Sequence, residues 1–481
     1  MDKKFKEKFL RGSAVTSIGQ ASSMVFHFAS IMILTRVIPR ADFGIYALIL
    51  VINNMFLILS SMGLDVTLVK FISSDSEDDK GSVFTKILLL KLLSLLFFVT
   101  IFLIAGKFFL PLFDEKILEF LFFIPTLFFL GSFRDLFFKV LQGLSYFKKY
   151  ALTQIVSAVS RLLLIIVFLT LEELNLGNLI YLEIFTAGAV LIVLLFLVPF
   201  KLIVQREMND VGFKTILNFS IPIYFNNMFT FLYGRVNLFI IGALMNPVSV
   251  AYYDVGAKVS EALKKMLNSF ILVFFPNLSN LFSKGDKASA AELINKSLNV
   301  ISLLLATATL FSFLFRNEII ILLFSEKYAE SSLVFSLLML NLTFRSLANI
   351  LGYSNLSAGH PKVPMKVNIV CSVVSLSGSF LMIPQFGYVC AAYSLIIMNT
   401  LAQALYILYL NKIELKINIF RYTKPVFLLF ITVVLYLLLN IDSISIRIIF
   451  ICFYLILNWI FVTEFKTLLI TILGFLRKSK S

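Results

Sequence analysis

The sequence predicts an all-α membrane protein whose chain crosses the bilayer about fourteen times. Hydrophobic residues make up 59% of the 481 positions, above the roughly 45 to 50% of soluble domains. They form about fourteen apolar runs, and a helix needs roughly 20 residues to cross a bilayer. The chain also contains a duplication, because a hairpin around Pro247 repeats the one around Pro39 after about 208 residues. These observations predict two pseudo-symmetric lobes of six helices and two additional helices.

The opening hairpin, Gly12 to Ile72, is typical of helices that pack in lipid. Its first arm, Ser13 to Leu34, contains no Asp, Glu, Lys or Arg. Small residues in this arm allow another helix to approach closely: Gly19, Ala21, Ser22, Ser23, Ala29 and Ser30. The basic start MDKKFKEKFLRG resembles a signal sequence. The apolar run after it is too long and lacks a small-residue cleavage site, so we expect a retained first helix.

The later runs are assigned in the same way. We expect spans at residues 13–38, 42–64, 84–105, 118–142, 151–171, 178–200, 215–243, 248–282, 290–315, 331–358, 363–384, 387–411, 425–440 and 444–465. The polar connection KLIVQREMNDVGFK separates the sixth run from the seventh. The expected domains are an N-terminal lobe at 1–204, a cytoplasmic linker at 205–214, a C-terminal lobe at 215–412, and helices 13 and 14 with a basic cytoplasmic tail at 413–481. An even number of helices in each lobe makes the two copies parallel repeats.

The net charge of +15 raises the question of nucleic acid binding. With the N-terminus inside, Lys and Arg of the cytoplasmic loops and tails outnumber those of the outer loops by roughly four to one. This asymmetry predicts cytoplasmic N- and C-termini and explains the basic charge without nucleic acid. The three cysteines form no CxxC pair, and no GxxxxGK[ST] motif occurs, so we expect no metal, no other cofactor and no ATP hydrolysis. H⁺ or Na⁺ is the expected coupling ion.

Several longer segments carry a family resemblance. They are TRVIPRADFGIYAL from Thr35, VAYYDVGAKVSEALKKMLNSFILVFFPNLSNLF from Val250, LFSEKYAESSLVFSLLMLN from Leu323, and the stretch from Ser354 to Ile397. In this order and spacing they resemble the polysaccharide-biosynthesis branch of the multidrug, oligosaccharidyl-lipid and polysaccharide exporter superfamily, which contains the O-antigen flippases.

This resemblance implies two six-helix lobes around a central cavity and no enzymatic activity. The implied function is movement of undecaprenyl-pyrophosphate-linked oligosaccharide, of O-antigen or capsule type, from the inner to the outer leaflet of the bacterial plasma membrane. The implied partners are this lipid-linked glycan, membrane lipids, and a polysaccharide polymerase with other assembly proteins. We expect a monomer.

Charged residues inside the expected spans are the candidate site, because a charge in lipid is costly and usually faces protein or water. The candidates for binding pyrophosphate are Arg134, Arg161, Arg235, Lys258, Lys265 and Arg345. Their planar guanidinium groups and their ammonium groups suit a phosphate. The candidates for ion coupling are Asp65, Glu183, Asp254 and Glu261. The alternative is that these charges pair with one another and only hold the lobe in shape.

Three local expectations follow. Asp254, Lys258, Glu261 and Lys265 fall on one helix face that alternates in sign and cannot lie against lipid. Asp135 projects about 100 degrees away from Arg134 on a helix, so the two charges need not cancel. Lys91 and Lys264 lie near helix ends, and Lys91 in particular is expected to extend to the membrane interface.

Three other functions stay open at this point. A drug or metabolite cation antiporter of the same superfamily would need an acidic cavity, whereas the first helix holds no carboxylate. A lipid II flippase differs in cargo alone. A membrane-embedded glycosyltransferase or polymerase usually has a long outer loop, and the outer loops here are short.

Overall fold

The fold is known from a computed structural model that describes residues 3–73, 80–199, 212–439, 443–462 and 465. These residues form helices and connecting turns, with no β-strand among them. Within this described part, 11 helices are long and apolar enough to cross a membrane, and two bent helices raise the number to 13. The expected span at 118–142 corresponds to a further helix, α5, which holds the charged residues Arg134, Asp135 and Lys139. The prediction of an all-α, multi-pass membrane protein is therefore confirmed.

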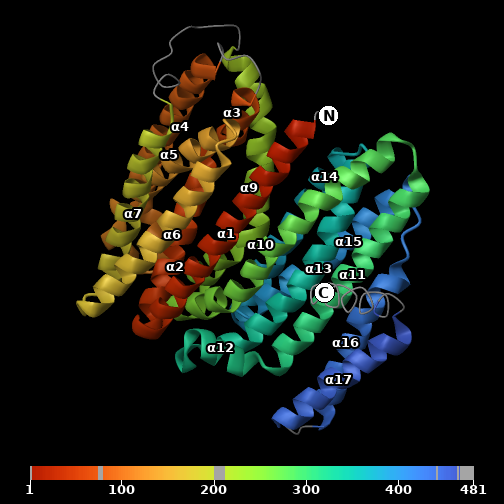
Figure 1. The fold of residues 1–481 in the computed structure, drawn as a ribbon. Helices are drawn as coiled ribbons and strands as arrows, with labels where there is room; N and C mark the ends of the chain where they lie inside the picture. The colour runs from red at the N-terminus through yellow and green to blue at the C-terminus, as the bar shows by residue number, and fades with distance from the viewer. Residues whose placement is uncertain (1–2, 74–79, 200–211, 440–442, 463–464, 466–481) are drawn as a thin grey trace, which may run out of the picture. The chain divides into compact units, whose positions relative to one another are not determined.

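The chain divides into two compact units, residues 1–254 and 255–481. The helices that begin in unit 1 are α1 (Lys3–Val37), α2 (Arg40–Ser61), α3 (Leu64–Ile72), α4 (Lys80–Phe109), α5 (Phe123–Gly143), α6 (Phe147–Thr170), α7 (Leu176–Leu197), α9 (Phe213–Leu244) and α10 (Pro247–Ser283), with short 3₁₀ helices η1 (Leu110–Leu112) and η2 (Glu115–Phe120) before α5 (Figure 1). The helix α10 runs across the boundary at residue 254 into unit 2.

Unit 2 continues with α11 (Lys287–Leu314), α12 (Arg316–Phe324), η3 (Glu326–Tyr328), α13 (Ser331–Ser357), α14 (Lys362–Phe386), α15 (Cys390–Lys412), α16 (Ile419–Leu439) and α17 (Ile444–Phe461). The last two pack together, and α16 lies along α11. The expected lobe boundaries remain predictions. Residues 205–211 of the expected linker and 466–481 of the expected tail lie outside the described residues.

Close packing of α1 on α6 follows from the small residues of α1. A Cβ placed on Gly19 would lie 2.6 Å from the Cβ of Ala151, so glycine lets the two backbones approach. At the other end of unit 1, a Cβ on Gly44 would lie 1.8 Å from the carbonyl oxygen of Pro247. The hairpin around Pro39 therefore contacts the start of its own repeat.

The second expected span, 42–64, corresponds to α2, an unbroken span at Arg40–Ser61 that is followed by a turn. Helix α2 ends at Ser61, and α3 begins at Leu64 after a turn in which Met62 (φ 46°) and Gly63 (φ 72°) adopt left-handed backbone conformations. Ser61 Oγ accepts a hydrogen bond from the Gly63 amide at 3.4 Å. The sequence marks this turn, because Ser60, Ser61, Gly63 and Asp65 interrupt the apolar run there.

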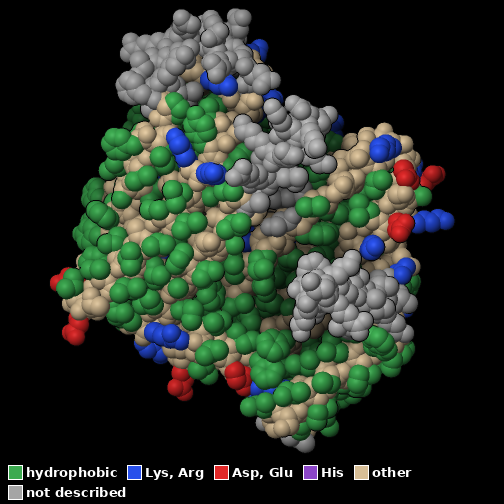
Figure 2. Space-filling model, in the orientation of Figure 1, with side chains coloured by type: hydrophobic (Ala, Val, Ile, Leu, Met, Phe, Trp, Pro, Cys, Tyr) green, Lys and Arg blue, Asp and Glu red, His purple; other side chains and the backbone are tan. Residues whose placement is uncertain are grey.

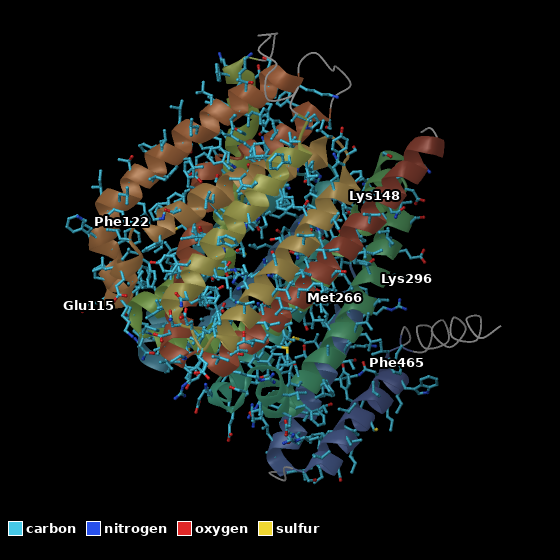
Figure 3. The ribbon with its side chains drawn as sticks, turned by 60° about the vertical axis from the view of Figure 1, so that its left-hand side comes forward. Glu115, Phe122, Lys148, Met266, Lys296 and Phe465 are labelled. Carbon is cyan, nitrogen blue, oxygen red and sulfur yellow. The ribbon has the colours of Figure 1, made fainter. Side chains whose placement is uncertain are left out.

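Apolar side chains cover much of the face shown in Figure 2, and charged side chains gather toward its edges. Phe122, just before α5, is exposed and points away from the helices (Figure 3). Such exposure of large apolar residues is expected where lipid replaces water around the protein.

Candidate functional site

The predicted site residues are distributed over both units. Unit 1 holds Asp65, Arg134, Arg161, Glu183, Arg235 and Asp254, and unit 2 holds Lys258, Glu261, Lys265 and Arg345. Among the described residues, no group of three or more His, Cys, Asp or Glu could hold a metal ion. The described charged residues include ion pairs in unit 1 and the lining of a basic pocket in unit 2.

A buried triad connects three helices of unit 1. Arg161 on α6 donates from Nε to Glu183 Oε1 on α7 at 2.7 Å, and from Nη2 to Tyr46 Oη on α2 at 2.7 Å. The Tyr46 hydroxyl in turn donates to Glu183 Oε1 at 2.6 Å. Arg161 and Tyr46 are buried, so a charge in this place needs a partner. The triad holds α2, α6 and α7 together. It includes Arg161, which was predicted to bind an anion, and Glu183, which was predicted to carry an ion.

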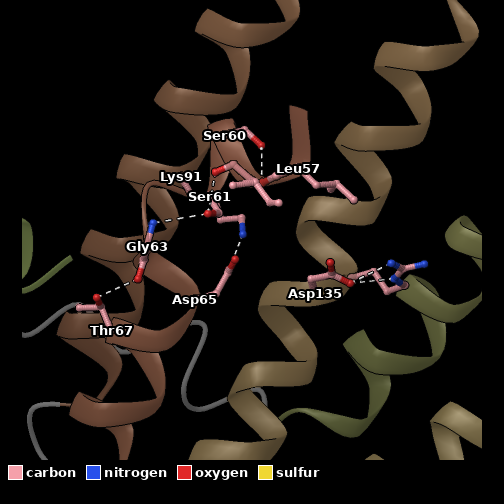
Figure 4. A network of polar contacts seen from close by, with 10 residues as sticks. Leu57, Ser60, Ser61, Gly63, Asp65, Thr67, Lys91 and Asp135 are labelled. Carbon is pink, nitrogen blue, oxygen red and sulfur yellow. Dashed lines mark hydrogen bonds and ion pairs between the residues drawn. The ribbon is translucent and has the colours of Figure 1, made fainter. Parts of the chain in front are cut away.

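A second buried pair joins Lys91 on α4 to Asp65 on α3, beside the turn between α2 and α3 (Figure 4). The expectation that Lys91 extends to the interface is wrong, because Lys91 is 0% exposed. Its position in the middle of α4 leaves the ammonium too far from either end, and Asp65 supplies the countercharge. Asp65, a predicted ion carrier, thus neutralises a lysine in this structure.

The pair Arg134–Asp135 corrects another expectation. Both Nε and Nη2 of Arg134 donate to Asp135 Oδ1, at 3.0 and 2.9 Å (Figure 4). The two Cα–Cβ bonds do diverge around the helix, but the long arginine side chain curves back to its neighbour. Arg134 is therefore partly neutralised within α5.

Burial decreases along the charged face of α10. Asp254 is 3% exposed, Lys258 and Glu261 are half-buried, and Lys265 is exposed. On α9, Arg235 is half-buried close to a 50° bend. These positions do not decide between pairing and cargo binding, so the assignment of α10 and Arg235 to a cavity remains a prediction.

A pocket in unit 2 is built from α10, α11 and α13. The pocket has about 20 Å³ of space for the centres of water-sized molecules, and the surrounding non-atom space of about 340 Å³ includes open solvent. Lys264 and Arg345 line it together with the amides of Asn268 and Asn349 and the hydroxyl of Ser346. The rest of the lining is apolar: Leu267, Phe270, Ile271, Ile301, Leu342 and Ile350. None of these described lining residues carries a carboxylate, so the pocket suits an anion attached to an apolar group.

The sequence prediction included Arg345 but set Lys264 aside as a residue near a helix end. The spacing of Lys264 from two residues that follow it on α10 could have placed it in this pocket. Lys264, Asn268 and Ile271 recur at i, i+4 and i+7, which places them on one helix face. This face lies immediately before and within the 40° bend of α10, where the helix leaves room for a pocket.

Comparison with known proteins identifies a family. The model of the polysaccharide biosynthesis protein family matches residues 9–282. The capsular polysaccharide biosynthesis protein CapF of Staphylococcus aureus is 24% identical over 206 residues, which are 43% of this chain and 52% of that protein. The probable low-salt glycan biosynthesis flippase Agl15 of Haloferax volcanii is 22% identical over 179 residues, or 37% and 38% of the two chains. These matches span about half or less of each relative.

Solved structures share the fold at low sequence identity. The lipid II flippase MurJ in an inward closed conformation has a TM-score of 0.69 at 13% identity, covering 93% of this chain and 98% of that one. An inward-facing multidrug resistance MATE family transporter has a TM-score of 0.67 at 13% identity, covering 80% and 93%. The Vibrio cholerae MATE transporter VcmN in its bent form has a TM-score of 0.55 at 14% identity, covering 86% and 98%.

Proposed function

Because the chain belongs to the polysaccharide biosynthesis protein family, we propose that it is a flippase for lipid-linked glycans. The cargo is a polyprenyl-pyrophosphate-linked oligosaccharide, which moves from the inner to the outer leaflet of the bacterial plasma membrane. The family match over residues 9–282 is the observation that carries this proposal. The multi-pass helical fold and the names of the two curated relatives support it.

The mechanism is transport without covalent chemistry. The two lobes alternate between inward and outward access, and the sugars and the pyrophosphate cross through a cationic cavity while the polyprenyl tail stays in lipid. A cavity of this sign is supported by the basic residues that the spans contain, since an anionic headgroup needs countercharge. The termini lie in the cytoplasm, as the distribution of Lys and Arg indicates.

The predicted cavity residues are placed differently in the structure. Arg134 and Arg161 are held by carboxylates in unit 1, so their contribution to cargo binding would require those pairs to open. Arg235, Lys258, Lys265 and Arg345 belong to the same proposed cationic set. For coupling to H⁺ or Na⁺, Asp65, Glu183, Asp254 and Glu261 are all candidates, and Asp65 and Glu183 would first have to release the cations that they neutralise.

Reconstituted transport tests this function. Proteoliposomes holding the purified protein receive a fluorescent lipid-linked oligosaccharide, lipid II or a cationic dye, each with and without an imposed H⁺ or Na⁺ gradient. We expect movement of the oligosaccharide and its acceleration by one of the gradients. Movement of the dye alone would instead identify a drug antiporter, and movement of lipid II alone would assign the other cargo. Either result would overturn the proposal.

A further inference from the structure

The two repeated hairpins contact each other through equivalent segments. Pro39 precedes α2 and Pro247 begins α10, so the copies are related by an offset of 208 residues. At this offset Gly44 on α2 corresponds to Tyr252 on α10. The contact, which we call the seam, joins Arg40 and Gly44 of α2 to Pro247 and Tyr252 of α10, all within unit 1. Because equivalent segments meet there, the seam lies at the axis that relates the two copies.

Backbone contact brings the helices together at the seam. A Cβ on Gly44 would lie 1.8 Å from the carbonyl oxygen of Pro247. About one helical turn further along α2, a Cβ on Gly242 of α9 would lie 2.5 Å from the Cδ2 atom of Leu48. Glycine at positions 44 and 242 therefore allows this close approach. Such contacts are held by dispersion attraction between closely packed atoms.

The polar contact across the seam is exposed. Arg40 Nη1 donates to the Tyr252 hydroxyl at 2.6 Å, and the guanidinium carbon lies 5.9 Å from the centre of the Tyr252 ring. Water can replace an exposed hydrogen bond of this kind at a small net cost. Further along α2, the buried triad of Tyr46, Arg161 and Glu183 holds this helix to α6 and α7. The attachment of α2 to α6 and α7 is thus stronger than its attachment to α10.

The position of the seam suits a gate. It follows the first span, so it lies on the outer side of the membrane when the N-terminus is cytoplasmic, as we propose. Repeats that rock around a central site give access to one side by separating at that end. We propose that the seam of Arg40, Gly44, Pro247 and Tyr252 is the outer gate, which is closed in this structure and separates to release cargo outward. This inference rests on the proposed function for the direction of transport.

Gly44 allows the closed state to be disfavoured by one methyl group. The atom that a Cβ at position 44 would meet belongs to the backbone of Pro247, so it cannot rotate away as a side chain could. Gly44→Ala must therefore separate α2 from α10 and favour the open state of the seam. Gly188→Ala on α7 is the matched control, because its added methyl group would lie 3.8 Å from its nearest neighbour, an ordinary contact.

The first test measures distances between spin labels in the purified full-length protein by pulsed electron paramagnetic resonance. Its three native cysteines, Cys371, Cys390 and Cys452, are replaced by alanine. Labels are attached to cysteines introduced at Val37 and Leu244, two exposed residues that precede the prolines of the two hairpins.

We expect Gly44→Ala to shift the Val37–Leu244 distances to longer values and Gly188→Ala to leave them unchanged. Labels at Phe122 and Tyr181, exposed residues near the contact between α5 and α7, should keep one distance in both variants. Unchanged Val37–Leu244 distances in Gly44→Ala would overturn the gate, as would an equal shift of the control pair. If Gly44→Ala does not fold, Arg40→Ala replaces it, with a smaller shift expected from the lost hydrogen bond.

The second test closes the seam covalently. In the cysteine-free protein, Arg40→Cys/Tyr252→Cys is joined by a short, reducible reagent that reacts with two thiols. We expect movement of the fluorescent lipid-linked oligosaccharide to fall at least about tenfold and to return after reduction, whereas joining Phe122→Cys to Tyr181→Cys should leave it unchanged. Transport at the full rate through a joined seam would refute the gate alone. A seam that opens in Gly44→Ala in a protein that moves no lipid-linked oligosaccharide would refute the function alone.

Discussion

Arg161 and Glu183 form a buried ion pair between α6 and α7, with 2.7 Å between guanidinium nitrogen and carboxylate oxygen. Tyr46 closes the contact by bonding to both. The pair lies in a span, where water does not reach an unpaired charge and a lost partner is costly. We therefore expect the loss of either partner of this ion pair to lower the stability of the protein, whether or not the pair contacts the cargo.

Replacing one partner of this pair should destabilise the protein strongly. Arg161→Met leaves the Glu183 carboxylate buried without its countercharge, so we expect a loss of about 3 kcal/mol, seen as a lower Tm in detergent. The double variant Arg161→Met/Glu183→Gln removes both charges and should recover much of this loss. A decrease in Tm of the double variant equal to the sum of the two single decreases would show that the residues do not interact.

The pair Lys91–Asp65 gives an independent prediction. Asp65→Asn should lower the Tm, because Lys91 is completely buried and loses its countercharge. As a control, Asp114→Asn changes an acid in the connection between η1 and η2 and should have a smaller effect. If Lys91 extended to the interface instead, the two substitutions would be equally mild.

Because α1 packs closely on α6, adding a single methyl group at Gly19 should destabilise the protein. Gly19→Ala places a Cβ 2.6 Å from that of Ala151, so the helices must separate, with an expected loss of about 1 to 3 kcal/mol. Gly188→Ala on α7 is the matched control, because its nearest neighbour, a Leu130 methyl group, would lie at an ordinary 3.8 Å. Thermal unfolding of both variants compares them directly, and equal Tm values would contradict the close approach.

The amino-terminal cap of α11 predicts a pH dependence. Hydrogen bonds from Ser289, whose amide donates to Asp286 Oδ1 at 3.0 Å, lower the pKa of the Asp286 carboxyl below its ordinary value of 3.8. A carboxyl whose pKa is lower in the folded state than in the unfolded state stabilises the fold at pH values above its ordinary pKa. This stabilisation is lost as the pH falls through the lowered pKa of the folded state. Asp286→Ala should therefore lower the Tm near neutral pH and approach the wild type in acid. A difference in Tm that stays constant with pH would exclude this role of the carboxylate.

Much of the fold could be predicted from the sequence, because apolar runs of sufficient length leave few structures other than helices in a membrane. The short helix α3 was not predicted as an element of its own, although Ser60, Ser61 and Gly63 mark the turn before it. Partners of charged residues were the least predictable part. Asp65 and Lys91 come from different helices, and the reach of the Arg134 side chain to Asp135 depends on its rotamer.

The candidate site shows the same limit. Arg345 was predicted from its charge within a span, but its pocket depends on how α10 bends and on which face of α10 meets α13. Lys264 acquires its significance from that packing. An ungapped repeat relates residues 112–136 to residues 323–347 in the sequence, and its Phe-Arg-x-Leu ending places Arg134 and Arg345 at equivalent positions with different neighbours.

The central claim is that this chain flips a lipid-linked glycan, whose anionic headgroup crosses among basic residues of the spans. The most direct measurement is the initial rate at which a fluorescent lipid-linked oligosaccharide moves between leaflets of proteoliposomes, read by chemical quenching of the outer leaflet. We predict a rate well above that of empty liposomes for the wild type, and a rate at least about tenfold lower for Arg345→Gln, which neutralises one of the predicted cavity cations. A wild-type rate equal to that of empty liposomes, or an Arg345→Gln variant as fast as the wild type, would contradict the account.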